Sequence, residues 1–173
     1  YQLLGQDTAK KTEDDGQTTI PAIIKPGKIT IEKWIVDWNS SDNSGRTKYS
    51  KNSAARGFIT GPATYEIYQS DGTTPAVIYY KDNDNKYQKI NGHTVTINPA
   101  EPSSGTNGDE GEISFFLNAG TYVIKETGRP TNTVVVNPQS GTLTRTVNED
   151  GAVKGEFYNK EQLGQVKIHK QDD

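Results

Sequence analysis

Polar and apolar residues alternate along most of the chain. The segment Lys28-Ile29-Thr30-Ile31-Glu32-Lys33 alternates strictly, with the two-residue period of a strand that buries one face. Similar short runs, separated by turn-forming Gly, Pro, Asn or Asp residues, cover 63–68, 75–80, 86–90, 94–98, 112–117, 121–126, 133–136, 143–147 and 152–159. No segment sustains a helical period. The pattern predicts an all-β protein, built as a sandwich or barrel of short strands.

The pair Asn91-Gly92 lies between two of these predicted strands, 86–90 and 94–98. Asn-Gly is the sequence that two-residue hairpin turns favour, because both residues tolerate a positive φ. We therefore expect these two strands to form a hairpin. The stretch 39–57, after the first strand, is rich in turn-forming residues.

The chain divides into three parts. Residues 1–26 are polar and irregular, and we interpret them as a linker or the tail of a preceding module rather than an extra strand. Residues 27–163 form the predicted β-domain. Residues 164–170 repeat the pattern of 27–33: Gly, polar, branched apolar, polar, Ile, polar, Lys. We interpret residues 164–173 as the start of the next repeat of a tandem array, with chance similarity between two strands as the alternative.

Composition narrows the function classes. The 173 residues carry a formal net charge of -3 with both signs interspersed, which argues against nucleic acid as a partner. No apolar run is long enough for a membrane span, so no membrane insertion is expected from this segment. The chain starts at Tyr1 without a signal peptide, and we interpret it as a fragment of a longer protein. It contains no Cys, which excludes disulfides as a source of rigidity.

Residues of equal parity share one face of a strand, and three strands carry a single polar residue on an otherwise apolar face. The three faces are Ile29, Ile31, Lys33 and Ile35 in the first strand; Tyr122, Ile124 and Glu126; and Val153, Gly155, Phe157 and Asn159 in the last strand.

Each of the three polar residues has an ordinary explanation when taken alone. Lys33 can extend its ammonium into water, Glu126 can open a turn, and Asn159 can close the last strand. A lysine, a carboxyl group and an amide buried together are costly unless they satisfy each other or react. Their combination therefore favours a shared chemical role.

Four blocks of the sequence resemble the CnaB/SpaA-type domains of Gram-positive adhesins and pilins. They are the opening strand 27–33, Tyr65-Glu66-Ile67-Tyr68 before Asp71-Gly72, the segment 117–127, and Gly155-Glu156-Phe157-Tyr158-Asn159-Lys160. The most specific is Gly-x-Tyr-x-x-x-Glu-Thr, at 120–127, and the order of the blocks matches the family from residue 27 to 160. The chain departs from the family in the turn Gly128-Arg129-Pro130-Thr131, which lacks the usual Gly-Tyr pair, and in a longer region between 73 and 111.

The resemblance implies an immunoglobulin-like antiparallel β-sandwich with an isopeptide bond between Lys33 and Asn159, assisted by Glu126. The chemistry follows from burial, which disfavours the ammonium and lowers the pKa of Lys33. A buried Lys–Glu pair can hold its shared proton as neutral amine and neutral acid. Neutral Lys33 then attacks the side-chain carbonyl of Asn159, while Glu126 polarises it and shuttles protons to the leaving ammonia. The reaction occurs once per chain and needs no cofactor, so no turnover enzyme is expected.

The resemblance also implies a function and a location. We expect a structural stalk or pilin-type module, attached to the cell wall on the extracellular surface of a Gram-positive bacterium. Its partners are neighbouring repeats of the same chain, and a host matrix protein or glycan is a further candidate. The alternative is a ligand-binding β-sandwich that recognises such a ligand through an exposed aromatic platform. The candidate residues for that platform are Trp34, Trp38, Tyr79, Tyr80 and Tyr87.

Two Asp/Asn-rich stretches, 37–43 and 82–85, have the oxygen-rich composition of calcium loops. Neither has the full loop motif with a closing Glu, and we interpret both as solvated turns. The two histidines, His93 and His169, give poor support for a zinc site or a Ser–His–Asp triad. The sequence therefore predicts no metal site.

Overall fold

The computed structural model describes residues 25–49, 59–99, 111–162 and 170–171. These residues form strands and turns, and none of them belongs to a helix long and apolar enough to cross a membrane. The strands are β1 (Gly27–Val36), β2 (Arg46–Lys48), β3 (Ala63–Gln69), β4 (Tyr79–Lys81), β5 (Tyr87–Lys89), β6 (Thr94–Ile97), β7 (Glu112–Leu117), β8 (Gly120–Gly128), β9 (Thr133–Asn137), β10 (Thr142–Val147) and β11 (Ala152–Glu161).

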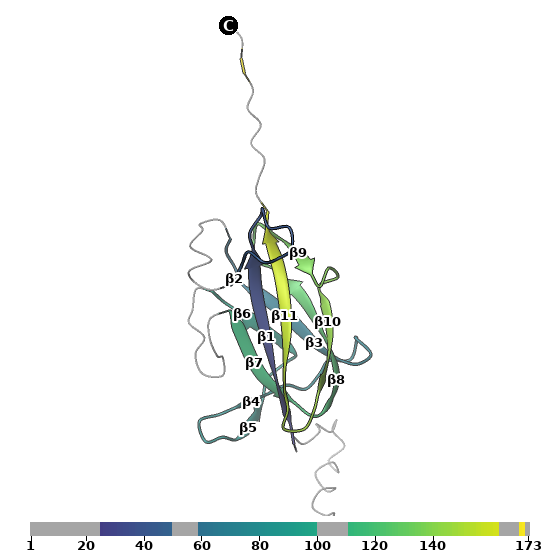
Figure 1. The fold of residues 1–173 in the computed structure, drawn as a ribbon. Coiled ribbons are helices and arrows are strands. Elements are labelled where there is room, and N and C mark those ends of the chain that lie inside the picture. The colour runs from purple at the N-terminus through teal and green to yellow at the C-terminus, as the bar shows by residue number, and fades with distance from the viewer. Residues whose placement is uncertain (1–24, 50–58, 100–110, 163–169, 172–173) are drawn as a thin grey trace, which may run out of the picture.

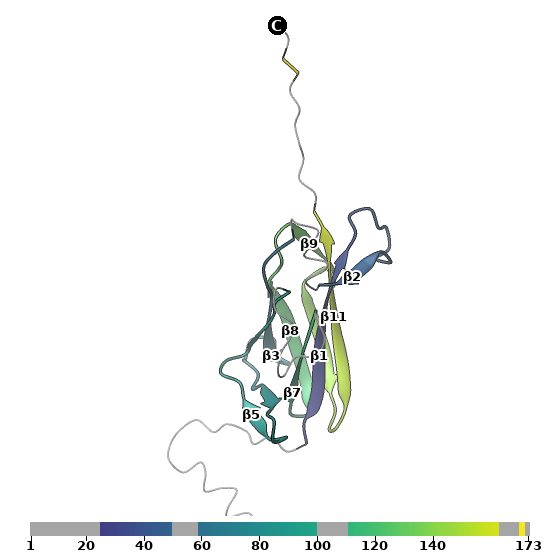
Figure 2. The ribbon, with the colours of Figure 1, turned by 90° about the vertical axis from the view of Figure 1, so that its left-hand side faces the viewer.

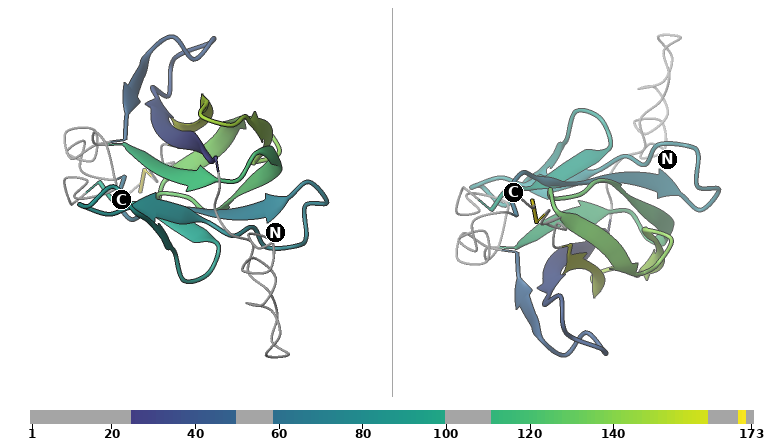
Figure 3. Two further views of the ribbon diagram at one scale, coloured as in Figure 1. Left: turned by 90° about the horizontal axis from the view of Figure 1, so that it is seen from below. Right: turned by 90° about the horizontal axis from the view of Figure 1, so that it is seen from above.

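The strands form two sheets that pack face to face (Figure 2 and Figure 3). The larger sheet has the order β5-β4-β7-β1-β11-β9, with β2 also paired to β1, and the smaller has the order β10-β8-β3-β6. All pairings between these strands are antiparallel except that of β1 with β11. The predicted immunoglobulin-like β-sandwich is confirmed.

The core lies between the sheets and is built from the inward faces that the alternation predicted. Its fully buried members include Ile29, Ile31, Tyr65, Ile67, Leu117, Ile124 and Phe157. In β11, Gly155, Phe157 and Asn159 are buried, as their shared parity requires.

The first and last strands lie side by side and run in the same direction (Figure 1). Their register runs from Lys28 opposite Ala152 to Val36 opposite Lys160. Because the strands are parallel, the chain enters β1 at one pole of the sandwich and leaves β11 at the other (Figure 1).

The predicted hairpin at Asn91-Gly92 is wrong. β5, before this pair, is hydrogen-bonded to β4 in the larger sheet, and β6, after it, is hydrogen-bonded to β3 in the smaller sheet. Only Gly92 of the pair has a positive φ, of 85°, whereas the hairpin turn favoured by Asn-Gly needs two such residues. The pair therefore belongs to a connection between the two sheets.

Two other segments differ from their predictions. The turn-rich stretch 39–57 contains a strand that was not predicted, β2, which pairs with the end of β1. In the predicted strand 75–80, only its last two residues belong to β4, and Pro75 forms an isolated bridge with Tyr68. Both segments are short and irregular, so a local pattern gives little signal for them.

The proposed flanking parts lie mostly outside the described residues. This applies to residues 1–24, 163–169 and 172–173, so the linker and the start of the next repeat stay predictions. At the N-terminal boundary, the Pro26 carbonyl accepts a hydrogen bond of 3.1 Å from the Asp150 amide, in the turn before β11. This contact fixes the point where the chain enters the sandwich.

Candidate functional site

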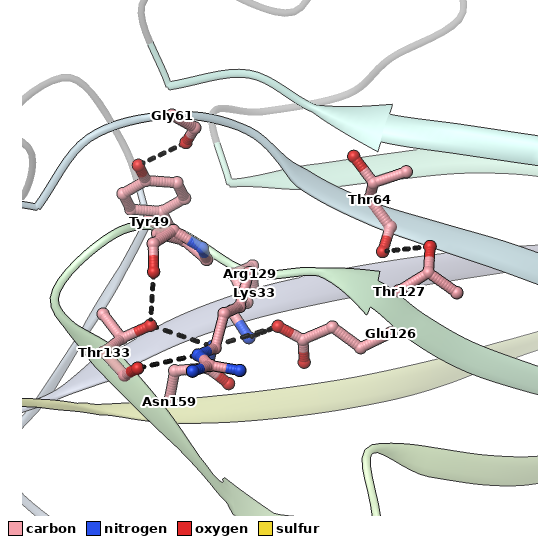
Figure 4. Close-up of polar contacts among 10 residues, drawn as sticks. Lys33, Tyr49, Gly61, Thr64, Glu126, Thr127, Arg129, Thr133 and Asn159 are labelled. Carbon is pink, nitrogen blue, oxygen red and sulfur yellow. Dashed lines mark hydrogen bonds and ion pairs between the residues drawn. The ribbon is translucent and has the colours of Figure 1, made fainter.

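Lys33 and Glu126 form a buried ion pair that joins the two sheets (Figure 4). Lys33 projects from β1 and Glu126 from β8, and their side chains are 0% and 1% exposed. The Lys33 Nζ donates a hydrogen bond of 2.7 Å to Glu126 Oε2. Two charged groups without access to water stabilise the fold only when each has a partner, so these two side chains depend on each other.

Asn159, on β11, is the third member of the cluster and is also fully buried. Its amide Nδ2 donates a hydrogen bond of 3.0 Å to the same Glu126 Oε2 that accepts from Lys33. The amine and the amide therefore converge on one oxygen atom (Figure 4). The structure thus brings together the three residues that the sequence singled out.

Burial controls the charge on Lys33. Loss of water around the amine lowers its pKa to about 8, although the nearby Glu126 carboxylate raises it and the Arg129 charge lowers it further. With this pKa, about a tenth of the amine is neutral at pH 7, compared with less than a thousandth for an ordinary lysine. The environment therefore supplies a usable fraction of nucleophile at neutral pH.

Thr133, at the start of β9, holds the amide of Asn159 from the other side. Its hydroxyl donates a hydrogen bond of 2.8 Å to the Pro130 carbonyl and accepts one of 3.2 Å from Asn159 Nδ2. Arg129 supports the same turn, since its Nε donates to the Thr133 carbonyl at 2.9 Å. Thr133 was not among the residues predicted from the sequence, because its contact depends on the register between β9 and β11, which no local pattern contains.

The cluster has the parts needed for acyl transfer between side chains. It contains an amine with a lowered pKa, an amide as electrophile, and a carboxyl group in contact with both nitrogen atoms. Groups held in contact react as if present at very high concentration.

In the Asp/Asn-rich turns, carboxylates accept hydrogen bonds from nearby residues of the same segment. Asp82 Oδ1 accepts hydrogen bonds from the amides of Asp84 and Lys86, and its Oδ2 accepts one from Gln88. Asp42 Oδ1 accepts from the Ser44 amide. Within the described ranges, no group of three or more His, Cys, Asp or Glu residues is placed to hold a metal ion.

The five candidate aromatic residues do not form one exposed platform. Tyr79 is buried, at 5% exposure, whereas Trp38 is 57% exposed. Trp34 lies under the Arg46 guanidinium, 5.1 Å from its ring centre, and Tyr87 packs edge-on against Phe116. The strands β2 and β4–β5 also lie toward opposite poles of the sandwich (Figure 1).

No family model and no curated protein matches this chain. Among solved structures, it is similar to GBS52, the minor pilin of Streptococcus agalactiae, with a TM-score of 0.52 and 17% identity over 86% of this chain and 50% of that one. The streptococcal ancillary pilin matches with a TM-score of 0.45 and 15% identity over 84% of this chain and 38% of that one. The major pilin SpaD of Corynebacterium diphtheriae matches with a TM-score of 0.37 and 18% identity, over 84% and 34%.

The chain therefore spans half the length of the minor pilin and less of the other two. The likeness to the minor pilin establishes a shared fold, that of one part of a larger pilin chain.

Proposed function

We propose that this chain is a structural stalk or pilin-type module of a Gram-positive cell-surface adhesin, stabilised by an isopeptide bond between Lys33 and Asn159. The observation that carries the proposal is the convergence of both nitrogen atoms on Glu126 Oε2, at 2.7 and 3.0 Å, inside the sandwich. The fold shared with a minor pilin supports the same assignment.

The proposed reaction begins with transfer of one proton from the Lys33 ammonium to Glu126. The neutral amine attacks Cγ of Asn159 and forms the new C–N bond, which places negative charge on Oδ1. Protons then pass through Glu126 to the Asn159 nitrogen, the bond from Cγ to Nδ2 breaks, and ammonia leaves. Glu126 Oε2 contacts both nitrogen atoms, so one carboxyl group serves both transfers. The step happens once per chain, which makes Glu126 a participant in self-crosslinking and not part of a turnover enzyme.

The position of the bond suits a stalk. β1 and β11 are the first and last strands of the sandwich, and tension along an array enters through one and leaves through the other. The chain contains no Cys, so a disulfide cannot perform this task. An amide bond also resists reduction.

We further propose an extracellular, cell-wall-attached location, with neighbouring repeats of the same chain as the principal partners. The ligand-binding alternative, with a host matrix protein or glycan as partner, has less support, because Tyr79 of the predicted aromatic platform is buried in the core.

The test is the intact mass of the folded chain. We expect a mass lower than that of the sequence by one ammonia, and a proteolytic peptide pair joined through Lys33 and Asn159. Asn159→Ala is the matched control, because it keeps the Lys33–Glu126 ion pair but removes the carbonyl that reacts. A folded wild-type chain with the full sequence mass would refute the crosslink.

A further inference from the structure

Three buried side-chain oxygen atoms have no hydrogen-bond partner among the described residues. They are Glu126 Oε1, Asn159 Oδ1 and the hydroxyl of Tyr65. A buried polar atom without a partner costs about 1–3 kcal/mol, so such atoms are rare outside functional sites. Two of the three belong to the site described above, and the third lies on β3.

Tyr65 borders the same site. It stands directly opposite Glu126 in the β3–β8 ladder, and neighbours in such pairs have Cβ atoms about 5 Å apart. Its ring packs on Phe157, with ring centres 4.8 Å apart. Phe157 is opposite Lys33 in the β1–β11 ladder and shares its inward face with Asn159. The Tyr65 side chain therefore packs beside Glu126 and Phe157, at the edge of the cluster, and its hydroxyl is not yet hydrogen-bonded to Asn159 Oδ1.

The hydroxyl of Tyr65 remains a hydrogen-bond donor. Burial raises its pKa well above 10, and the Glu126 charge raises it further. The group is fully enclosed, at 0% exposure, so water does not compete for its proton.

Asn159 Oδ1 needs a donor during the proposed reaction, because attack on Cγ places negative charge on this oxygen. The other donors around it have different tasks. Lys33 is the nucleophile, the Thr133 hydroxyl donates to the Pro130 carbonyl, and Glu126 must deliver its proton to the leaving nitrogen. Arg129 is an exposed residue whose Nε donates to the Thr133 carbonyl. Tyr65 has an uncommitted hydroxyl.

We propose that the Tyr65 hydroxyl donates a hydrogen bond to Asn159 Oδ1 as the isopeptide bond forms, and is therefore a second catalytic residue beside Glu126. The inference rests on the proposed crosslinking function. Removal of one such donor from an enzyme slows the reaction by about 100-fold to 1000-fold. We expect a loss at the lower end of this range, about 100-fold.

The experiment uses the full chain and follows ammonia loss over time. Chain recovered unfolded from insoluble aggregates is checked by mass to be unlinked and is then refolded by dilution. Tryptophan fluorescence reports folding, and intact mass reports linking. Tyr65→Phe keeps the ring that packs on Phe157 and removes only the hydroxyl. Tyr122→Phe is the matched control, because it removes a hydroxyl from β8, the strand of Glu126, that donates to the Asn118 carbonyl at 2.7 Å.

Support requires that Tyr65→Phe folds and links about 100-fold more slowly, while Tyr122→Phe links at the wild-type rate. Equal linking rates in Tyr65→Phe and the wild type would overturn the proposal. A slower rate together with a shifted pH–rate profile would also overturn it, since Tyr65 would then act through the charge of Glu126 and not on the reacting carbonyl.

Two further measurements cover the other outcomes. If Tyr65→Phe does not fold, a chain with 3-fluorotyrosine at position 65 is measured in its place, because this residue keeps a hydroxyl group and makes it a stronger hydrogen-bond donor. Faster linking is then expected, and an unchanged rate would contradict the proposal. A wild-type chain that folds but never loses ammonia would refute the crosslinking function itself, which separates that failure from failure of the role of Tyr65.

Discussion

Tension on this domain loads its first and last strands in shear. A pull on the two ends draws Gly27 and Glu161 toward opposite poles, and β1 and β11 are parallel neighbours (Figure 1). With a bond between Lys33 and Asn159, the load passes from β1 directly into β11, and residues 34–158 carry none of it. Asn159→Ala removes the bond and keeps the Lys33–Glu126 ion pair, so the variant isolates the mechanical effect of the crosslink.

The expected lengths follow from the chain geometry. Unfolding of the unlinked variant releases residues 34–158, about 125 residues, which at about 3.3–3.6 Å per residue gives an extension of roughly 400 Å. In the linked chain only 27–32 and the residues after Asn159 can extend. The six strand residues before Lys33 contribute about 20 Å and the two after Asn159 about 7 Å. The two extensions therefore differ about fifteenfold.

Single-molecule pulling on tandem copies measures this difference. We expect no steps near 400 Å in the wild type and one such step per domain in Asn159→Ala. Asn148→Ala, at an exposed asparagine before β11, is the control and should behave as the wild type. Full-length steps in a wild-type array whose mass shows ammonia loss would refute the assigned load path.

Three further predictions concern the buried cluster. Glu126→Ala should fold but keep the full sequence mass, because Lys33 loses its proton acceptor; normal ammonia loss would remove Glu126 from the mechanism. In urea unfolding, the free energy of unfolding of Asn159→Ala should be about 5 kcal/mol below that of the wild type, the value expected for loss of a closed loop of this length. Lys33→Ala should lose about 3 kcal/mol beyond that, because Glu126 is left buried without its partner. Equal stability of the wild type and Asn159→Ala would contradict this order. In Asn159→Ala, the pKa of Lys33 in the folded state, about 8, lies below the ordinary lysine value of 10.5. Between these pH values the unfolded state binds more protons, so the free energy of unfolding should rise with pH across that window, relative to Lys33→Met/Asn159→Ala. A fall would show that folding raises the pKa of Lys33.

Local alternation of polar and apolar residues was enough to predict where most strands lie and which way their side chains point. Side-chain direction in a strand alternates with every residue, so the inward placement of Lys33, Glu126 and Asn159 followed from parity with Ile31, Ile124 and Phe157. Their burial confirms that placement. Resemblance to a family, and not the alternation, linked the three faces to one another.

Strand pairing, in contrast, could be read only from the three-dimensional fold. Asn91-Gly92 has the local preference of a hairpin, yet it connects two sheets, because β5 pairs with β4 in the larger sheet and β6 pairs with β3 in the smaller one. Thr133 and Tyr65 reach the site through the ladders of β9 with β11 and of β3 with β8. Such pairings join residues far apart in the chain, and their free energy comes from packing of whole faces. A pattern a few residues long therefore predicts which way a side chain points, but it does not predict which strand lies beside it.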